Sequence, residues 1–268
     1  MKRTDGKHAE ASGAVKILFN MLYPLITVGA VLLVWYLGSL AAHSAIVLPA
    51  PAATLERLLG LLRAGEFWRS FANTLLRSLF SFCLSFLLAA GLGVSSRLFG
   101  VFRRLIEPLI AIFRALPTVA VILLLVLWMS PGGAAVAVAL LVIMPTLYAA
   151  LLSALDNIDQ PLFDMCRVFG VKRSRILGRM ILPMLLPEVI LTLASGLSLN
   201  LKLLVAAEVL SNTAHSLGAM MNAAKIYFDT AELLALTIVS VVAAVLMEWG
   251  IKTAAKPLYR WKDAGGRV

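Results

Sequence analysis

The residues of this chain that could do chemistry are charged side chains placed inside apolar runs. Arg114 and Lys202 both lie in segments long enough to cross a membrane, where a charge at mid-bilayer costs at least about 2.5 kcal/mol on insertion scales. Each is therefore a candidate for binding or transport. We expect Arg114 either to line a path for an anion or to extend toward the inner surface, because it lies only about six residues into its apolar run.

Lys202 lies deeper in its run, with Ser198 and Asn200 nearby in the sequence. We expect its ammonium group either to attract a negatively charged solute or to pair with a carboxylate on another helix. Glu208 lies at the outer end of the same run and is expected to gate or cap it. The spacing of Glu208 from Lys202 is poor for a pair on one helix, where neighbours are three or four residues apart. Three further carboxylates are expected to anchor helices at the inner edge: Glu107, Glu188 and Glu248.

Several kinds of catalytic chemistry have no residues to support them. The sequence contains no G-x-x-x-x-G-K-[ST] phosphate loop, no H-E-x-x-H zinc motif and no nucleophile elbow. Its three histidines are scattered, and Cys83 and Cys166 match neither a disulfide framework nor a metal motif. We therefore expect no enzyme activity, bound cofactor or metal in this chain. Any energy for active transport must come from an ion gradient or from a separate ATPase.

The composition places these residues in a membrane. The chain of 268 residues is 61% hydrophobic and only 14% charged, which is more apolar than a soluble domain of this size requires. A span needs about 20 apolar residues, and it must be helical because lipid does not tolerate unpaired backbone groups. The predicted fold is an all-α membrane protein with six transmembrane helices, at 22–42, 74–95, 108–129, 134–152, 187–207 and 233–251.

The positive charges indicate how the chain crosses the membrane. They cluster between and beside the apolar runs, which excludes nucleic acid as the reason for the net charge of +10. With the N-terminus inside, four inner segments hold 17 of the 24 Lys and Arg residues: 1–21, 96–107, 153–186 and 252–268. This bias predicts that both termini are cytoplasmic. The first run is too long for a secretory signal and is expected to remain as an uncleaved helix.

These boundaries divide the chain into three predicted parts. They are a cytoplasmic N-terminal segment at 1–21, a transmembrane domain at 22–252 and a basic cytoplasmic tail at 253–268. On the outer side, 43–73 contains LERLLGLLR, whose helical period predicts an amphipathic helix that caps the bundle.

The inner segment 153–186 contains DMCRVFGVKRSRILGRMILP at 164–183. Pro161 suits the first turn of a short helix and Gly170 its end, and a second helix is expected from about Lys172 into Pro183. Two short helices joined at a glycine would form an elbow that fits a groove on another protein. The alternative is an ordinary loop whose cations only enforce topology.

This loop resembles a known family. Asp164-Met165-Cys166, Gly170 and Met180-Ile181-Leu182-Pro183 are similar to the EAA loop, E-A-A-x-x-x-G-x(9)-I-x-L-P, of permease subunits of binding-protein-dependent ABC importers. The spacing is intact, but the first three positions depart from the pattern, which implies a partner groove of different shape. Four other stretches resemble the nitrate, sulfonate and taurine permease group: RALPTVAVILLLVLWM (114–129), VAAEVL (205–210), YFDTAELLALTIV (227–239) and KPLYRW (256–261).

The resemblance, which covers about Leu48 to Trp261, implies the type I importer permease fold in a bacterial inner membrane. It implies a homodimer of permease subunits, two cytoplasmic ATPases that bind ATP and magnesium, and an external solute-binding protein. The solutes of such importers include sulfonates, taurine, nitrate and vitamin precursors. The ATPase-coupling residues it implies are Pro161, Asp164, Met165, Cys166, Arg167, Gly170, Lys172, Leu182 and Pro183.

Two other functions are compatible with the residues. Charges inside the membrane, at Arg114 and Lys202, favour an ion-coupled secondary transporter or a channel. The basic loop alone would also suit a membrane scaffold that recruits a cytoplasmic partner. Asp164 has a local alternative as well, because a carboxylate near a helix start is stabilised by the helix dipole.

Overall fold

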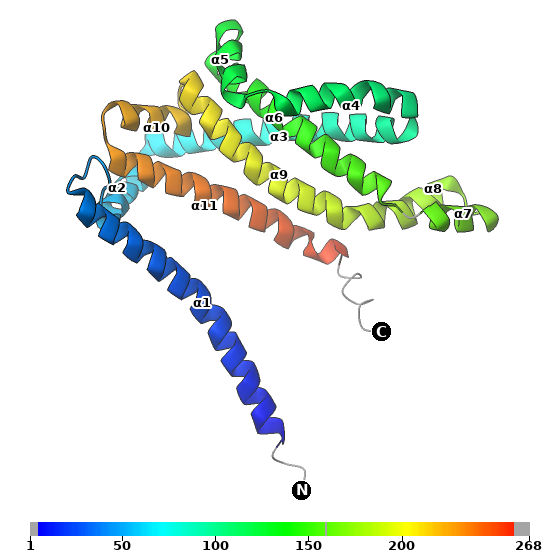
Figure 1. Cartoon of the computed structure of the whole chain (residues 1–268), viewed down its shortest axis with the longest axis horizontal. Helices are drawn as coiled ribbons and strands as arrows, with labels where there is room; N and C mark the ends of the chain where they lie inside the picture. The colour runs from blue at the N-terminus through cyan, green and yellow to red at the C-terminus, as the bar shows by residue number, and fades with distance from the viewer. Residues whose placement is uncertain (1–4, 159, 260–268) are drawn as a thin grey trace. The chain divides into compact units, whose positions relative to one another are not determined.

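The computed structural model describes residues 5–158 and 160–259, and within the helices it places side chains from residue 22 onward, except at 24, 160, 162, 163, 167, 173, 174, 177, 258 and 259. Throughout this described part the ordered structure is helical (Figure 1). The elements are α1 (Asp5–Ala42), α2 (Pro51–Arg63), α3 (Gly65–Leu98), α4 (Gly100–Ala115), α5 (Thr118–Trp128), α6 (Pro131–Asp156), α7 (Gln160–Val168), α8 (Arg173–Ile176), a π-helical turn (Leu177–Ile181), α9 (Leu182–Ser211), α10 (Leu217–Ile226), α11 (Thr230–Ala255) and a 3-10 turn (Lys256–Tyr259).

Five of these helices are long and apolar enough to cross a membrane, or six spans if α4 and α5 together make one. The predicted all-α membrane fold is confirmed, and α1, α3, α6, α9 and α11 contain five of the six predicted spans. Most of these helices extend beyond the predicted boundaries. For example, α3 begins at Gly65 rather than at residue 74, because apolarity marks the membrane-embedded part of a helix and not its polar extensions.

The predicted continuous helix at 108–129 is wrong. The structure ends α4 at Ala115, starts α5 at Thr118 and bends the chain by 94° between them. Leu116 has ψ 130, an extended conformation that the following proline favours because its ring clashes with a helical preceding residue. Pro117 is the N-cap residue of α5, and its carbonyl accepts a hydrogen bond from the amide of Val121 at 3.2 Å.

The chain divides into two compact units, one formed by residues up to Leu61 together with Ala224–Ala235, and the other by Leu62–Ala223 together with the chain from Leu236. In the first unit, Arg57 of α2 forms ion pairs with Asp229, at 2.8 Å, and with Glu232. The predicted amphipathic helix on this segment is confirmed as α2. Its ion pairs join it to the segment that leads into α11.

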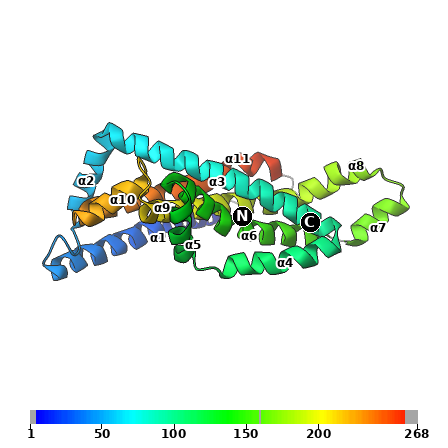
Figure 2. The ribbon, with the colours of Figure 1, turned by 90° about the horizontal axis from the view of Figure 1, so that it is seen from above.

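In the second unit, α3, α6 and α9 pack against one another, and α4 packs against α3 and α6 (Figure 2). The buried face of α3 is made almost entirely of small residues three or four apart: Ser70, Thr74, Ser78, Ser81, Ser85, Ala89, Gly93 and Ser96. Many of its large apolar side chains, such as Leu76, Phe80 and Leu87, are exposed. Small residues let helix backbones approach closely, and in lipid this packing replaces the hydrophobic effect as the source of association.

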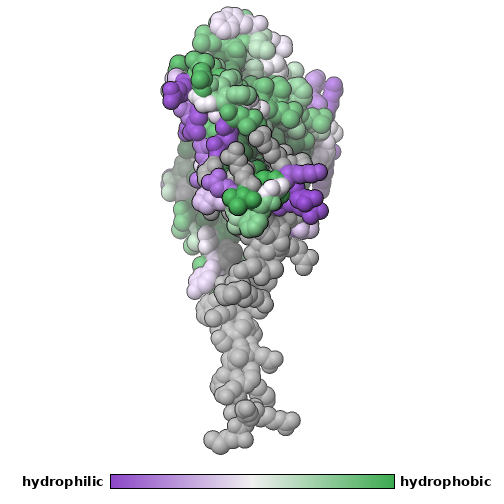
Figure 3. Space-filling view, turned by 90° about the vertical axis from the view of Figure 1, so that its right-hand side faces the viewer, coloured by the Kyte–Doolittle hydropathy of each residue, from purple (hydrophilic) through white to green (hydrophobic). Residues whose placement is uncertain are grey.

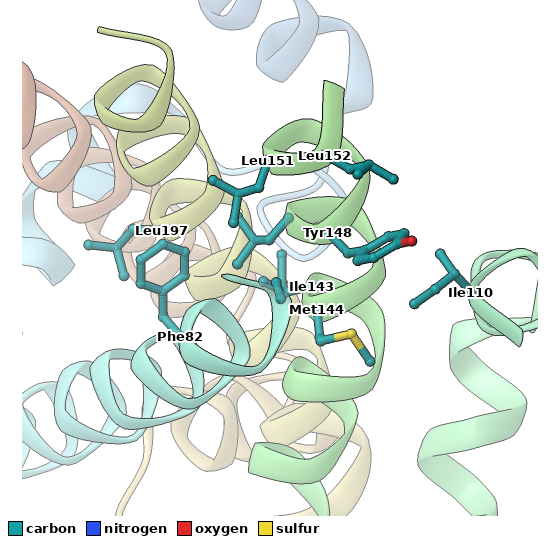
Figure 4. Close-up of a cluster of buried hydrophobic side chains, with 10 residues drawn as sticks. Phe82, Ile110, Ile143, Met144, Tyr148, Leu151, Leu152 and Leu197 are labelled. Carbon is teal, nitrogen blue, oxygen red and sulfur yellow. The ribbon is translucent and has the colours of Figure 1, made fainter. Parts of the chain in front are cut away.

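A larger apolar cluster fills the centre of this unit (Figure 4). Phe82 of α3, Leu147 of α6 and Leu197 of α9 are all buried in it. Gly196 allows the approach, because a Cβ atom there would lie 2.9 Å from Leu147 Cδ2 and 3.1 Å from Phe82 Cε2. Met247 and Ile251 bring α11 into the same cluster.

Candidate functional site

The basic loop forms a helical elbow. Its first helix, α7, begins at Gln160 with Pro161 in the first turn and ends at Val168. Gly170 then adopts φ +65 and the amide of Val171 donates to the carbonyl of Cys166 at 3.0 Å, which is the Schellman arrangement that closes a helix at a glycine. The predicted short helix closed by Gly170 is therefore confirmed. Asp164 lies outside the first turn of α7, which weakens the helix-dipole alternative for this residue.

The second half of the elbow continues into a spanning helix. The carbonyl of Lys172 accepts the amides of Arg175 and Ile176, at 2.9 and 3.1 Å, and so starts α8. A π-helical turn from Leu177 to Ile181 connects α8 to α9. The predicted second helix, from about Lys172 into Pro183, thus continues through this turn into α9. Pro183 lies in the first turn of α9, where a missing backbone donor is tolerated.

The elbow presents apolar side chains. Met165, Val168 and Phe169 are 51%, 83% and 77% exposed, although they lie in α7 and the turn directly after it, outside the candidate spans. Figure 3 looks onto the end of the second unit that carries α7 and α8, where apolar surface lies between hydrophilic side chains. Cys166 is half-buried, with its Sγ 3.7 Å from Met180 Sδ. Arg167, predicted to belong to this coupling loop, has a side chain outside the described set.

A buried carboxylate closes the opposite end of α9. Glu208 is fully buried; its two oxygens accept hydrogen bonds from Thr74 Oγ1 at 2.8 Å and from Arg77 Nη1 at 3.1 Å. The hydroxyl of Thr74 also accepts a hydrogen bond from the backbone amide of Leu217, the first residue of α10, at 3.0 Å. Glu208 therefore joins α9 to α3 and, through Thr74, to the start of α10, and its surroundings satisfy the charge that burial would otherwise leave unpaired.

The loop between α9 and α10 is shaped around this carboxylate. Asn212 has φ 48 and donates its amide to the carbonyl of Glu208, which ends α9. The hydroxyl of Ser216 accepts the amide of Ala219 at 2.9 Å and so caps the start of α10. At Gly218 a Cβ atom would lie 2.5 Å from the backbone carbon of Glu208, so only glycine fits at this crossing.

Asn200, a predicted path residue, lies in the packing between α9 and α3. It is fully buried, and its Nδ2 donates to the carbonyl of Ser78 at 2.8 Å and to Ser81 Oγ at 2.9 Å. Its Oδ1 is the one buried side-chain oxygen or nitrogen without a hydrogen-bond partner in the described part of the chain. Asn200 and Glu208 thus both face the helix packing, whereas Lys202 between them is exposed.

Lys202 is exposed on α9. The carboxylate of Glu248 in α11 feels its charge only weakly, as the smallest of several influences on that group. Within α11, Lys252 Nζ donates to Glu248 Oε1 at 2.6 Å. Glu248 is therefore paired with Lys252, and no carboxylate of the described residues lies within ion-pair distance of Lys202, so a positive charge remains on the exposed face of α9.

Arg114 lies apart from these groups, in the last turn of α4, where a cation is favourable to the helix dipole. It lines a cavity between α4 and α6. The structure therefore separates the four predicted path residues: two are buried against α3, one is exposed on α9 and one lies at the end of α4.

Sequence reasoning did not find the partners of Glu208. Thr74 and Arg77 precede it by 134 and 131 residues, and Thr74 is not charged. The available signal was the occurrence of one cation and one carboxylate near the same ends of two predicted spans. Charge compensation inside a membrane makes such residues candidate partners.

Long apolar helices packed through small residues, polar groups satisfied between those helices, and an elbow outside the spans together define a multi-pass membrane transport subunit. The chain belongs to the family described as the binding-protein-dependent transport system inner membrane component, whose model matches residues 81–261.

Curated relatives of the chain are transport permeases. It is 28% identical over 242 residues to the taurine transport system permease protein TauC of Escherichia coli strain K12, covering 88% of each chain. It is 26% identical over 254 residues to the putative aliphatic sulfonates transport permease protein SsuC of Bacillus subtilis strain 168, covering 92% of this chain and 90% of the relative. A riboflavin transport system permease protein, RibX of Chloroflexus aurantiacus, is 28% identical and covers 76% of this chain and 77% of its own length.

Solved importers share the fold. A chain of a bacterial alginate ABC transporter, crystallised in complex with alginate pentasaccharide-bound periplasmic protein, aligns with a TM-score of 0.63 at 16% identity, over 93% of this chain and 97% of that chain. A chain of the MetNI methionine ABC transporter in an inward-facing conformation aligns with a TM-score of 0.59 at 18% identity, over 71% of this chain and 94% of that chain. The chain is thus a permease component of a binding-protein-dependent ABC importer with the type I fold, which is favoured over a secondary transporter, a channel or a scaffold.

Proposed function

We propose that this permease works as a homodimer with a pair of cytoplasmic ATPases and an external solute-binding protein, and that it imports a small organic anion of the sulfonate type. It lies in the bacterial cytoplasmic membrane with both termini in the cytoplasm, as the distribution of its cations supports. The chain itself holds no cofactor; ATP and magnesium belong to the ATPase.

The observation that carries the coupling proposal is the exposed apolar surface of the elbow. Val168 and Phe169 are 83% and 77% exposed at the end of a helix that lies outside the candidate spans. Two large apolar side chains presented together by a rigid short helix suit a groove on a partner protein. Of the two interpretations of the basic segment, this surface supports docking over an ordinary loop that only sets topology.

The connection behind the elbow suits it to transmit motion. Helix α8 passes through the π-helical turn directly into α9, which carries Lys202. Because packed helices move as rigid elements, a displacement of the docked elbow would shift α9 against its neighbours. ATP-driven closure of the two ATPases would in this way alternate access to the path between the two permease subunits.

An anionic solute is supported by the uncompensated positive charge at Lys202 together with the relatives that carry taurine and aliphatic sulfonates in their names. A lysine on the exposed face of a spanning helix is costly in lipid, so its presence there indicates a functional role. The role that we propose for Lys202 is to attract the anionic group of the solute.

The coupling proposal can be tested by exchanging one elbow side chain. Phe169→Ser should abolish co-purification of the cognate ATPase, because it removes an apolar side chain from the docking surface. Phe99→Ser is the matched control, since Phe99 is also highly exposed, at 63%, but lies at the junction of α3 and α4. Both variants should express and remain monodisperse.

Equal ATPase recovery with the two variants would overturn the elbow as the docking site. Uptake that continues without any ATPase but stops when the ion gradient is collapsed would overturn the importer proposal itself.

A further inference from the structure

A cavity of about 410 Å³ lies between α4 and α6, within the second unit. We call it the α4–α6 slot. In Figure 4, Tyr148 of α6 and Ile110 of α4 point toward each other across part of it. Arg103 and Arg114 line it near the two ends of α4, about 16 Å apart along the helix at 1.5 Å per residue. The other lining residues are Glu107, Ala111, Ala149, Leu152, Ser153 and Asp156.

The two ends of the slot differ in charge. At one end Arg103 donates to Glu107 Oε1 at 2.6 Å and to Asp156 Oδ2 at 2.8 Å, and Arg97 adds a second cation 3.5 Å from Asp156. The charges at that end balance. At the other end no carboxylate among the described residues lies within ion-pair distance of Arg114, so its guanidinium is the uncompensated charge of the slot.

The middle of the slot is apolar. Ile110 and Leu152 are 5% exposed and form its walls together with Ala111 and Ala149. The hydroxyl of Tyr148 is already used, because it donates to Ser96 Oγ at 2.9 Å. A ligand that fits these surroundings carries one anionic group for Arg114 and a hydrocarbon part for the walls.

The slot is separate from the face of α9 that carries Lys202. Leu147 of α6 packs toward Gly196 of α9 and Leu151 toward Gly93 of α3. At about 100° per residue, the slot-lining residues of α6 are centred about 170° around the helix from Leu147. The slot therefore lies on the opposite side of α6 from α9.

We infer that the α4–α6 slot binds an anionic amphiphile, with an oxyanion head such as phosphate or sulfonate paired to Arg114 and a hydrocarbon stem between Ile110 and Leu152. Arginine matches the geometry of such oxyanions because its planar guanidinium can donate two parallel hydrogen bonds. A cavity of this volume lies in the range of small-ligand sites and accommodates a head group and a short hydrocarbon segment. The source is either a membrane phospholipid or a soluble alkyl sulfonate.

The test measures binding to the purified full-length chain, without ATPase or transport, so its failure is distinct from failure of the importer proposal. Native mass spectrometry compares the binding of anionic dioleoyl phosphatidylglycerol with that of neutral phosphatidylcholine. Calorimetry compares the binding of anionic hexanesulfonate with that of neutral hexanol. Arg114→Gln removes the cation. Ala149→Leu fills the slot but leaves Arg114 unchanged. Arg104→Gln is the matched control, because Arg104 lies on α4 outside the slot lining.

We expect Arg114→Gln and Ala149→Leu each to weaken binding of an anionic probe at least about tenfold, the loss expected for one charge-assisted contact. Arg104→Gln should change it less than about twofold. If the two variants weaken only the binding of phosphatidylglycerol, the slot is a lipid site. If they weaken the binding of hexanesulfonate, it is a solute site. The inference is overturned if no anionic probe binds, if Ala149→Leu binds as tightly as the unaltered chain, or if Arg104→Gln weakens binding as much as Arg114→Gln.

Discussion

At the scale of single residues, Glu208 is the one charged side chain that is buried among the described residues. Its carboxylate accepts hydrogen bonds from a threonine and an arginine of α3 while being fully excluded from solvent. A buried charge is stable only when such partners remain in place. Removing it therefore tests whether the outer end of α9 depends on this network.

We predict that Glu208→Ala lowers the free energy of unfolding by about 3 kcal/mol, the lower end of the range for breaking a buried ion pair, since Arg77 keeps partial access to solvent. The measurement is the unfolding midpoint of the purified chain in detergent. Glu188→Ala on the same helix is the control, because Glu188 is exposed, and should change stability by less than about 0.5 kcal/mol. Adding Arg77→Ala to Glu208→Ala should cost less than the sum of the two single losses; full additivity would contradict the pair.

At the scale of elements, the sequence predicted helices better than their interruptions. Apolar runs of about 20 residues located the spans because lipid leaves the backbone few alternatives to a helix. Hydropathy did not reveal the 94° break at Leu116 and Pro117, because apolar residues lie directly on both sides of it. The elbow was predictable because Pro161 and Gly170 act locally, on one helix start and one helix end.

The contacts between helices could not be predicted in the same way. Asn200 bonds to Ser78 across a separation of 122 residues, and hydropathy does not indicate which face of a spanning helix is covered. The serine-rich face of α3 is polar yet buried, the reverse of the pattern in a soluble helix. Only the packing of α3 against α6 and α9 identifies which of the predicted path residues are enclosed.

That packing depends on a close approach at Gly196. Gly196→Ala should lower the unfolding free energy by about 1–3 kcal/mol, the usual cost of overpacking, because its Cβ would lie 2.9 Å from Leu147 Cδ2. Leu147→Val has no Cδ atoms, so it removes the crowding Cδ2 methyl group and should relieve part of this loss in the double variant. Gly91→Ala, with no atom within 4 Å of its added Cβ, should not destabilise α3, since alanine favours helices. A similar loss at Gly91 and Gly196 would show that crowding is not the cause.

At the scale of the whole molecule, import requires that binding of the solute and motion of the elbow act on one element. Helix α9 meets this requirement, because it begins at the π-helical turn behind the elbow and carries Lys202 in its C-terminal half. The slot between α4 and α6 lies across α6 from this helix, so a ligand there would act on packing rather than on the path. Transport measurements on Lys202 therefore test its proposed role on the path without involving the slot.

We predict that Lys202→Met reduces uptake of a sulfonate into cells that contain the complete importer at least about tenfold, the effect of losing about 1.4 kcal/mol of attraction for the anion. Assembly with the ATPase should be unchanged. The competing explanation is that Lys202 serves only to neutralise Glu248, a carboxylate that Lys252 already contacts. The exchanged pair Lys202→Glu with Glu248→Lys separates the two explanations, because it restores the opposite charges while placing a carboxylate on the path. Under the proposed role uptake stays low in the exchanged variant, whereas recovery of uptake would show that the pair is structural and that the anion is attracted elsewhere.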